Sequence, residues 1–152
     1  MLSRINFLTI GQTPRSDLMP EIAAALPRSL DIVEQGALDG LEPDEVASLA
    51  PGADDQALVT RMRDGTQVVI GKRWLTGRIQ ELLDAGSRSP DEATVLLCTG
   101  DFPGLSGRRL FFDAQHLVDH GVAALSSGVV TLGVVLPLAR QEEETHVEPT
   151  PG

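Results

Sequence analysis

The stretch ATVLLCTGDFPG, residues 93–104, joins a six-residue, largely apolar run to a loop that is rich in glycine and proline. A short apolar run bounded by turn residues is typical of a strand that is covered on both faces in a parallel sheet. We therefore predict a buried parallel strand over residues 93–98, followed by a loop at its carboxyl end. Cys98, the only cysteine of the chain, is the last residue of this strand.

Strand and helix signals alternate on both sides of this stretch. Apolar runs predict further strands over residues 5–10, 29–38 and 130–138. Helical spacing predicts helices over residues 17–26 (capped by Ser16), 42–50, 72–85 and 113–120 (ended by Gly121). Asp64-Gly65 lies between two strand-like runs in residues 57–71 and predicts a β-hairpin. The pattern predicts an α/β fold, a three-layer sandwich with a largely parallel sheet, plus the hairpin.

Composition narrows the class of protein. The 22 acidic and 12 basic residues give a formal charge of −10, which argues against nucleic-acid and anionic membrane partners. A single cysteine cannot form an internal disulfide, and no export signal is visible, so we expect a reduced thiol in the cytoplasm. Residues 1–140 are predicted to form one domain, and the charged, proline-rich residues 141–152 a disordered tail.

A ligand site is expected where two loops leave the carboxyl ends of predicted parallel strands. Beside the backbone N–H groups of a Thr-Gly turn, Cys98 is a candidate thiolate that serves as base or nucleophile, although a buried filler is an equally weighted interpretation. Arg15 suits a substrate carboxylate, the alternative being a surface arginine after a Thr-Pro turn. The candidate substrate-binding residues are Gly11, Gln12, Thr13, Arg15, Thr99 and Gly100.

Two other groups of residues are weaker candidates for a functional site. His116 and His120 have the spacing of two zinc ligands on one helix face, but no third ligand set is apparent, so we predict neither a metal nor a cofactor. Two partly exposed imidazoles near a helix C-terminus are the simpler interpretation. A hydrolase built from Cys98 and His116 would lack a nucleophile-elbow pattern.

Five ordered blocks of this sequence resemble the AroM family. They are LTIGQTPRSDLMPEI (8–22), EQGALDGLEPDEVASLAP (34–51), LVTRMRDGTQVVI (58–70), LLCTGDFPGL (96–105) and LGVVLPLARQ (132–141). The resemblance implies a likeness to the aspartate/glutamate/hydantoin racemase superfamily, in which two flavodoxin-like α/β halves enclose a cleft. In that superfamily two thiols act on opposite faces of a carbon next to a carboxylate, and Cys98 corresponds to the first. Racemases tend to show Cys-Asn-Thr where this chain has Cys98-Thr99-Gly100.

The resemblance also implies a second half with another cysteine motif, whereas this chain ends at Gly152. One interpretation is a cofactor-independent isomerase, racemase or lyase that uses Cys98 as acid or base on a small carboxylate. The other is a non-catalytic small-molecule-binding or regulatory domain, or an inactive fragment. Since the second half normally covers the cleft face, we expect an exposed apolar edge and either a homodimer or a marginally stable monomer.

Overall fold

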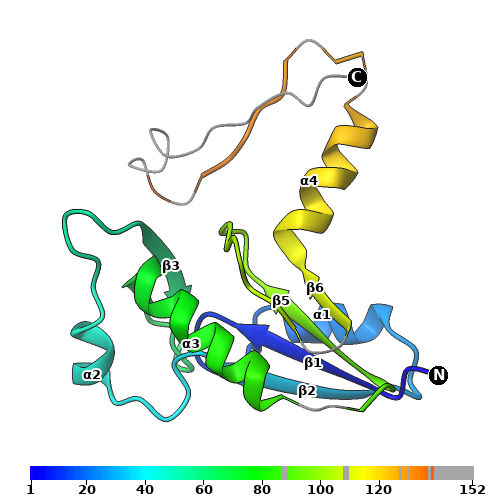
Figure 1. Cartoon of the computed structure of the whole chain (residues 1–152), viewed down its shortest axis with the longest axis horizontal. Helices are drawn as coiled ribbons and strands as arrows, with labels where there is room; N and C mark the ends of the chain where they lie inside the picture. Colours follow the sequence, from blue (N-terminus) through cyan, green and yellow to red (C-terminus); the bar gives the residue numbers. More distant parts are fainter. Residues whose placement is uncertain (87–88, 108–109, 127, 130, 137, 139–152) are drawn as a thin grey trace.

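The computed structural model describes residues 1–86, 89–107, 110–126, 128–129, 131–136 and 138 (Figure 1). The predicted tail, residues 141–152, lies outside the described residues. The main sheet contains β1 (Arg4–Thr9), β2 (Asp31–Gly36), β5 (Glu92–Leu97) and β6 (Leu110–Asp113). β3 (Ala57–Arg61) and β4 (Gln67–Gly71) form a separate hairpin. The helices are α1 (Met19–Ala25), α2 (Pro43–Ala47), α3 (Lys72–Ala85) and α4 (Ala114–Leu125).

The predicted α/β fold is confirmed. All pairs in the main sheet are parallel, and the strand order is β2-β1-β5-β6. Successive side chains of a strand point to opposite faces, so each face of the sheet has its own apolar cluster. Ile5 and Phe7 of β1 pack with Met19 of α1 on one face. Leu8 of β1 packs with Ile79 of α3 on the other, which gives three layers (Figure 1).

This strand order places a topological switch point between β1 and β5. From β1 the chain passes through α1 to β2 on one side, and β5 then pairs on the other side of β1. In open parallel sheets the ligand crevice lies at the carboxyl ends of the two strands beside such a switch point. The loops that begin at Ile10 and Cys98 leave the sheet at this point. They are the two loops in which the sequence predicted a ligand site.

Two predicted elements agree closely with the structure. The hairpin turns at Asp64-Gly65, where Gly65 has a φ of 87° and the Asp64 carboxylate accepts a hydrogen bond from the Thr66 N–H at 2.8 Å. The helix predicted over residues 72–85 is α3, and the Gly86 N–H closes its last turn on the carbonyl of Leu83. Apolar spacing and turn chemistry decide these segments locally.

Other elements differ from the prediction: α2 and β2 are shorter than the predicted residues 42–50 and 29–38. Ser16 does not cap α1, because residues 15–18 form a turn and the helix begins at Met19 after Leu18. α4 continues through Gly121 to Leu125, since one glycine inside a helix costs only about 1 kcal/mol. β6 was not expected, because a four-residue strand carries little periodicity and depends on its pairing with β5.

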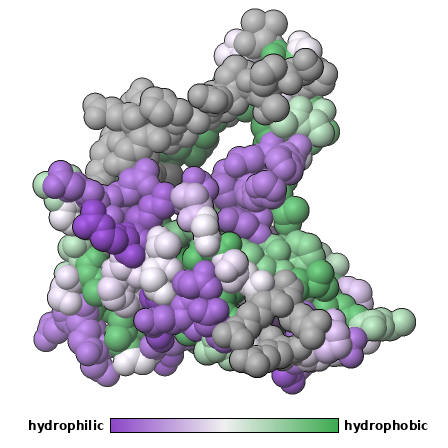
Figure 2. All heavy atoms as spheres, viewed as in Figure 1, coloured by the Kyte–Doolittle hydropathy of each residue, from purple (hydrophilic) through white to green (hydrophobic). Residues whose placement is uncertain are grey.

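The strand predicted over residues 130–138 is wrong for the part of it that the structure describes. Residues 131–136 form no strand, and Val135 is 96% exposed. A strand requires a hydrogen-bonding neighbour as well as apolar residues, and α4 leads the chain away from the sheet before this segment begins (Figure 1). Hydrophobic surface remains around β6 at the base of α4 (Figure 2), where Leu110 and Phe112 are 52% and 39% exposed.

No helix in the described part of the chain is long and apolar enough to cross a membrane.

Candidate functional site

Cys98 lies directly after β5, on the face of the sheet that α3 covers. Its side chain is half-buried, and the Gly100 N–H donates a hydrogen bond to Sγ at 3.3 Å. Glycine lets this loop fold tightly over the thiol, since a Cβ at Gly100 would lie 3.1 Å from Leu58 and 3.3 Å from the Phe102 ring. Phe102 is only 3% exposed and closes this side of the site.

The environment of the thiol favours its protonated form. Burial raises the pKa of Cys98 to about 11, and the carboxylate of Asp113 raises it as well. The backbone N–H of Gly100 and the charge of Lys72 lower the pKa, but they do not offset the loss of solvent. Cys98 is therefore a thiol at neutral pH, which disfavours the thiolate, one of the two interpretations of this residue that the sequence left open.

Gln12 ties three segments together at the end of β1. Its amide nitrogen donates to the carbonyls of Leu38 and Leu41 at 3.2 and 3.1 Å, and its amide oxygen accepts from the Arg63 N–H at 3.1 Å. The hydrogen-bonding groups of this side chain are thus used to join the β1 loop, the β2 loop and the hairpin. Gln12 thereby fixes the positions of these three segments relative to one another.

Thr13 is held by Asp39, which sequence reasoning missed. The Asp39 carboxylate accepts hydrogen bonds from the Thr13 N–H at 2.8 Å and the Thr13 hydroxyl at 2.7 Å, and also from the Gly36 N–H. The available signal was the Asp39-Gly40 pair, because Gly40 adopts a φ of 80° in the turn after β2. Thr13 is therefore engaged in the protein's own hydrogen bonds.

The hairpin lies across both loops of the switch point. The Gln12 N–H donates to the carbonyl of Arg61 at 3.1 Å, and a Cβ at Gly11 would collide with that same carbonyl oxygen. Thr60, on the same strand, is 5% exposed, and its hydroxyl has no hydrogen-bond partner among the described residues. Leu58 contacts the other loop at Gly100. The buried face of β3 thus covers the carboxyl ends of β1 and β5.

Arg15 lies apart from Cys98. Its guanidinium forms two hydrogen bonds of 2.8 Å with the Asp17 carboxylate and a third, of 2.9 Å, with the Thr9 hydroxyl. The pKa of Asp17 is accordingly lowered, chiefly by the hydrogen bond from Arg15. Thr9 alternates with Leu8 along β1 and therefore faces α1, whereas Cys98 faces α3. The sheet separates the predicted carboxylate-binding arginine from the thiol.

Comparison with protein-family models matches the AroM protein family over residues 5–148. The chain belongs to the AroM family. The matched region contains the main sheet except for Arg4, together with both loops of the switch point. No curated protein and no solved structure gave a significant match.

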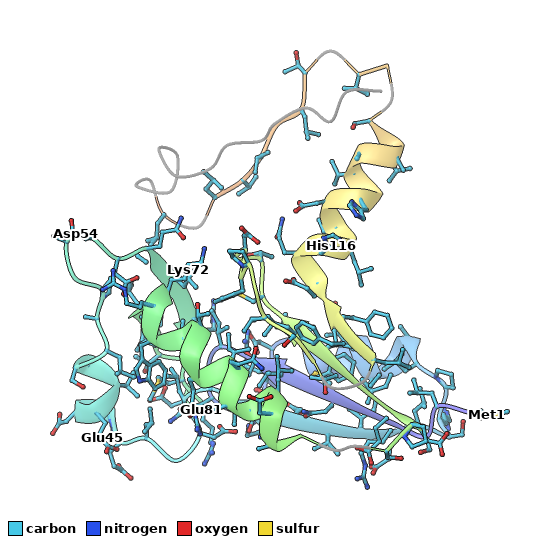
Figure 3. The ribbon with its side chains drawn as sticks, in the orientation of Figure 1. Met1, Glu45, Asp54, Lys72, Glu81 and His116 are labelled. Carbon is cyan, nitrogen blue, oxygen red and sulfur yellow. The ribbon has the colours of Figure 1, made fainter. Side chains whose placement is uncertain are left out.

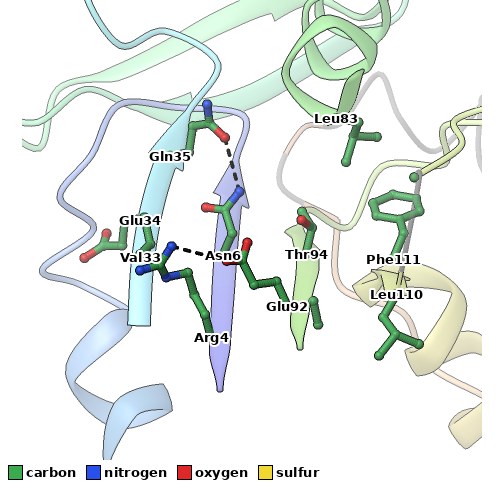
Figure 4. A pocket seen from close by; sticks show the side chains of 12 residues that line it. Arg4, Asn6, Val33, Glu34, Gln35, Leu83, Glu92, Thr94, Leu110 and Phe111 are labelled. Carbon is green, nitrogen blue, oxygen red and sulfur yellow. Dashed lines mark hydrogen bonds and ion pairs between the residues drawn. The ribbon is translucent and has the colours of Figure 1, made fainter. Parts of the chain in front are cut away.

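The AroM chain has two cavities of interest. One, of about 290 Å³, lies over the amino-terminal halves of the strands (Figure 4), where Arg4 pairs with Glu92 and Asn6 bonds with Gln35. The other, of about 240 Å³, lies at the carboxyl edge between the loop after Cys98 and the start of α4. The smaller cavity lies on the β6 side of the loop after Cys98, and Asp113, one of its walls, also raises the pKa of the thiol.

The smaller cavity of the AroM chain is lined by acidic groups. Its walls include Asp101, Asp113, His116 and Asp119, and Asp113 also caps α4 by accepting a hydrogen bond from Gln115 at 2.9 Å. The rings of His116 and His120 lie 4.2 Å apart between centroids. Within the described ranges, no group of three or more His, Cys, Asp or Glu side chains is placed to hold a metal ion.

The predicted site residues of the AroM chain thus form two groups. Cys98, Thr99 and Gly100 lie together beside the β3 face of the hairpin, and the backbone of Gly11 adjoins the same strand. Gln12, Thr13 and Arg15 are occupied by contacts within the protein. Sequence reasoning missed the groups that act on the thiol, namely Lys72, Phe102 and Asp113.

Proposed function

We propose that this AroM-family chain transfers a proton at the carbon next to the carboxylate of a small molecule, with Cys98 as the acid. The single observation that carries the proposal is the position of the Cys98 thiol at the carboxyl end of β5, beside the topological switch point. Burial, which raises the pKa of Cys98 to about 11, keeps this thiol protonated at neutral pH. A group that is protonated at neutral pH suits the delivery of a proton to a carbanion. The proposal needs a free thiol and therefore a reducing compartment such as the cytoplasm.

In exchange, the small thiolate fraction of Cys98 first removes the α-hydrogen, and Sγ, once its proton has exchanged with solvent, returns a solvent hydrogen to the same face of the carbon. The thiolate would be stabilised by the Gly100 N–H and by the charge of Lys72. One thiol serves one face of the carbon. Cys98 is the thiol that this sequence supplies, and the chemistry we propose for it is one-sided, of the lyase or exchange type. The proposal keeps the reaction centre of the racemase superfamily while using one of its two acid-base groups.

A specific observation favours a second candidate, a non-catalytic domain that binds a small molecule. The pKa of about 11 makes Cys98 a poor base at neutral pH, and the polar groups of Gln12 and Thr13 are used to hold loops together. Under this alternative, a ligand binds at the carboxyl edge and Cys98 contributes packing alone.

Deuterium exchange separates the two candidates. A panel of small α-substituted carboxylic acids is incubated with the protein in D₂O, and proton NMR follows loss of the α-hydrogen signal. We expect exchange with the native chain and a loss on the order of a hundredfold or more in Cys98→Ser, because serine is too weak an acid for the same step. The control Thr66→Ser changes an exposed residue in the turn between β3 and β4 and should retain exchange.

Each result has one meaning. Exchange that survives in Cys98→Ser refutes the acid role of the thiol. Absence of exchange with every acid, together with shielding of Cys98 from alkylation by one of them, favours the binding domain. Circular dichroism and thermal melting of both variants confirm that any loss is chemical and does not arise from unfolding.

A further inference from the structure

Lys72 is the only lysine of the chain and the first residue of α3, directly after β4. Its Nζ donates a hydrogen bond to the Gln56 side-chain oxygen at 2.7 Å. The same nitrogen lies 5.8 Å from the centroid of the Phe102 ring, within the range of a cation–π contact. Phe102 belongs to the loop that follows Cys98. The ammonium group is thus held by the hairpin on one side and by the site loop on the other.

The positive charge of Lys72 has no carboxylate partner in the described part of the chain. Arg4, Arg15 and Arg78 each form an ion pair there, but none is found for Lys72. An ammonium has three N–H donors, and Gln56 uses one of them. Lys72 is thus a half-buried cation with N–H donors that are not used by the described residues.

Phe102 links Lys72 to the thiol. The Phe102 ring and Cys98 Sγ lie 3.3 and 3.4 Å from the same point, the position of a Cβ at Gly100, so the ring is close both to the thiol and to the ammonium. The charge of Lys72 also lowers the pKa of Cys98. Figure 3 labels Lys72 on α3 and His116 on α4, with the loop after β5 between them. On the α4 side, the cavity is lined by the carboxylates of Asp101, Asp113 and Asp119.

Charges of opposite sign therefore lie on two sides of the thiol. Lys72 supplies positive charge on the side of α3, and the aspartates supply negative charge on the side of α4. An anion approaching Cys98 is repelled from the α4 side and attracted to the α3 side. We propose that Lys72, and not Arg15, binds the carboxylate of the substrate and holds it beside Cys98. That this anion is the substrate of a reaction depends on the proposed function, whereas its binding by Lys72 does not.

Alkylation with two reagents of the same chemistry tests this assignment. Iodoacetate carries a carboxylate and iodoacetamide is neutral. In both reactions the thiolate sulfur forms a bond to carbon and iodide leaves. Because both reagents consume the same thiolate, a change in the pKa of Cys98 cancels in the ratio of their rates. The native chain should favour iodoacetate more than Lys72→Met does, with a decrease in the ratio of about fivefold, the size expected for one partly exposed charge.

Matched variants make the result specific. Lys72→Arg keeps the charge and should keep the ratio, and Arg15→Met removes a guanidinium on the other face of the sheet and should leave the ratio unchanged. Propionate serves as a competitor that should slow the iodoacetamide reaction of the native chain but not that of Lys72→Met. If Lys72→Met fails to fold, Lys72→Gln provides a second neutral side chain that can still bond with Gln56.

The outcomes separate this inference from the proposed function. An unchanged ratio in both neutral variants overturns the role of Lys72, even if Cys98→Ser abolishes deuterium exchange. A decrease of the same size in Arg15→Met also overturns it, because the effect would then be one of overall charge. A decrease confined to the Lys72 variants supports the anion site, even where exchange survives in Cys98→Ser and the acid role of the thiol is refuted.

Discussion

The reactivity of Cys98 with pH is the most direct test of the site. Burial raises the pKa of this thiol from an ordinary 9.0 to about 11, a shift of two pH units. Since only the thiolate reacts, the shift lowers the reactive fraction at neutral pH about a hundredfold relative to an unperturbed cysteine. The rate of reaction with iodoacetamide, followed by intact-protein mass spectrometry, should rise through a midpoint near pH 11 in the native chain.

Two comparisons establish the cause of the shift. In guanidinium chloride the same residue is solvated, so the midpoint should return to about pH 9. In Asp113→Asn the native midpoint should fall, because the carboxylate of Asp113 disfavours the thiolate. A native midpoint at or below the unfolded value would refute the argument from burial and would restore the thiolate predicted from the sequence.

Further predictions concern stability and association. Gly11→Ala places a methyl group against the carbonyl of Arg61 and should cost about 1–3 kcal/mol in chemical denaturation, whereas Gly77→Ala, in open space within α3, should stabilise the chain by up to about 1 kcal/mol. The half-buried thiol of Cys98 has a higher pKa in the folded than in the unfolded chain, so its ionisation opposes folding. The free energy of unfolding should therefore fall by at most about 3 kcal/mol as the pH rises from 9 to 11, and this fall should be absent in Cys98→Ala. The exposed apolar side chains of α4 predict self-association, which light scattering should detect and Leu117→Glu should reduce; a native chain that stays monomeric at high concentration contradicts this.

The sequence predicted those parts of the fold that are decided locally. The apolar stripe of α3 and the Asp64-Gly65 turn are determined by residues close together in the sequence, and both elements form where expected. β6 and residues 131–136 show the opposite case. Four residues, LFFD, become a strand because β5 lies beside them, whereas a longer apolar segment forms none after α4 has left the sheet. Pairing partners, which local patterns do not reveal, decide such segments.

The same distinction holds for the candidate site. The switch-point geometry follows from the alternation of strands and helices, so the position of Cys98 at the carboxyl edge was predictable. The hydrogen bonds that occupy Gln12 and Thr13 were not, because they involve the hairpin and the turn after β2, which are 26 or more residues away. The pKa of the thiol depended on burial by Phe102 and its neighbours, and tertiary packing alone determines that burial.

The parallel pairing of β1 and β5 joins residues that are far apart in the chain, such as Arg4 and Glu92. As the ribosome extends the polypeptide, β1 can pair with β2 early, but its other edge stays open until the hairpin, α3 and β5 have all emerged. Sheets that depend on such distant pairs fold slowly, and an open strand edge during that time invites aggregation. Rapid expression therefore increases the risk that nascent chains aggregate before β5 has paired with β1, and slower synthesis or a lower temperature should reduce aggregation.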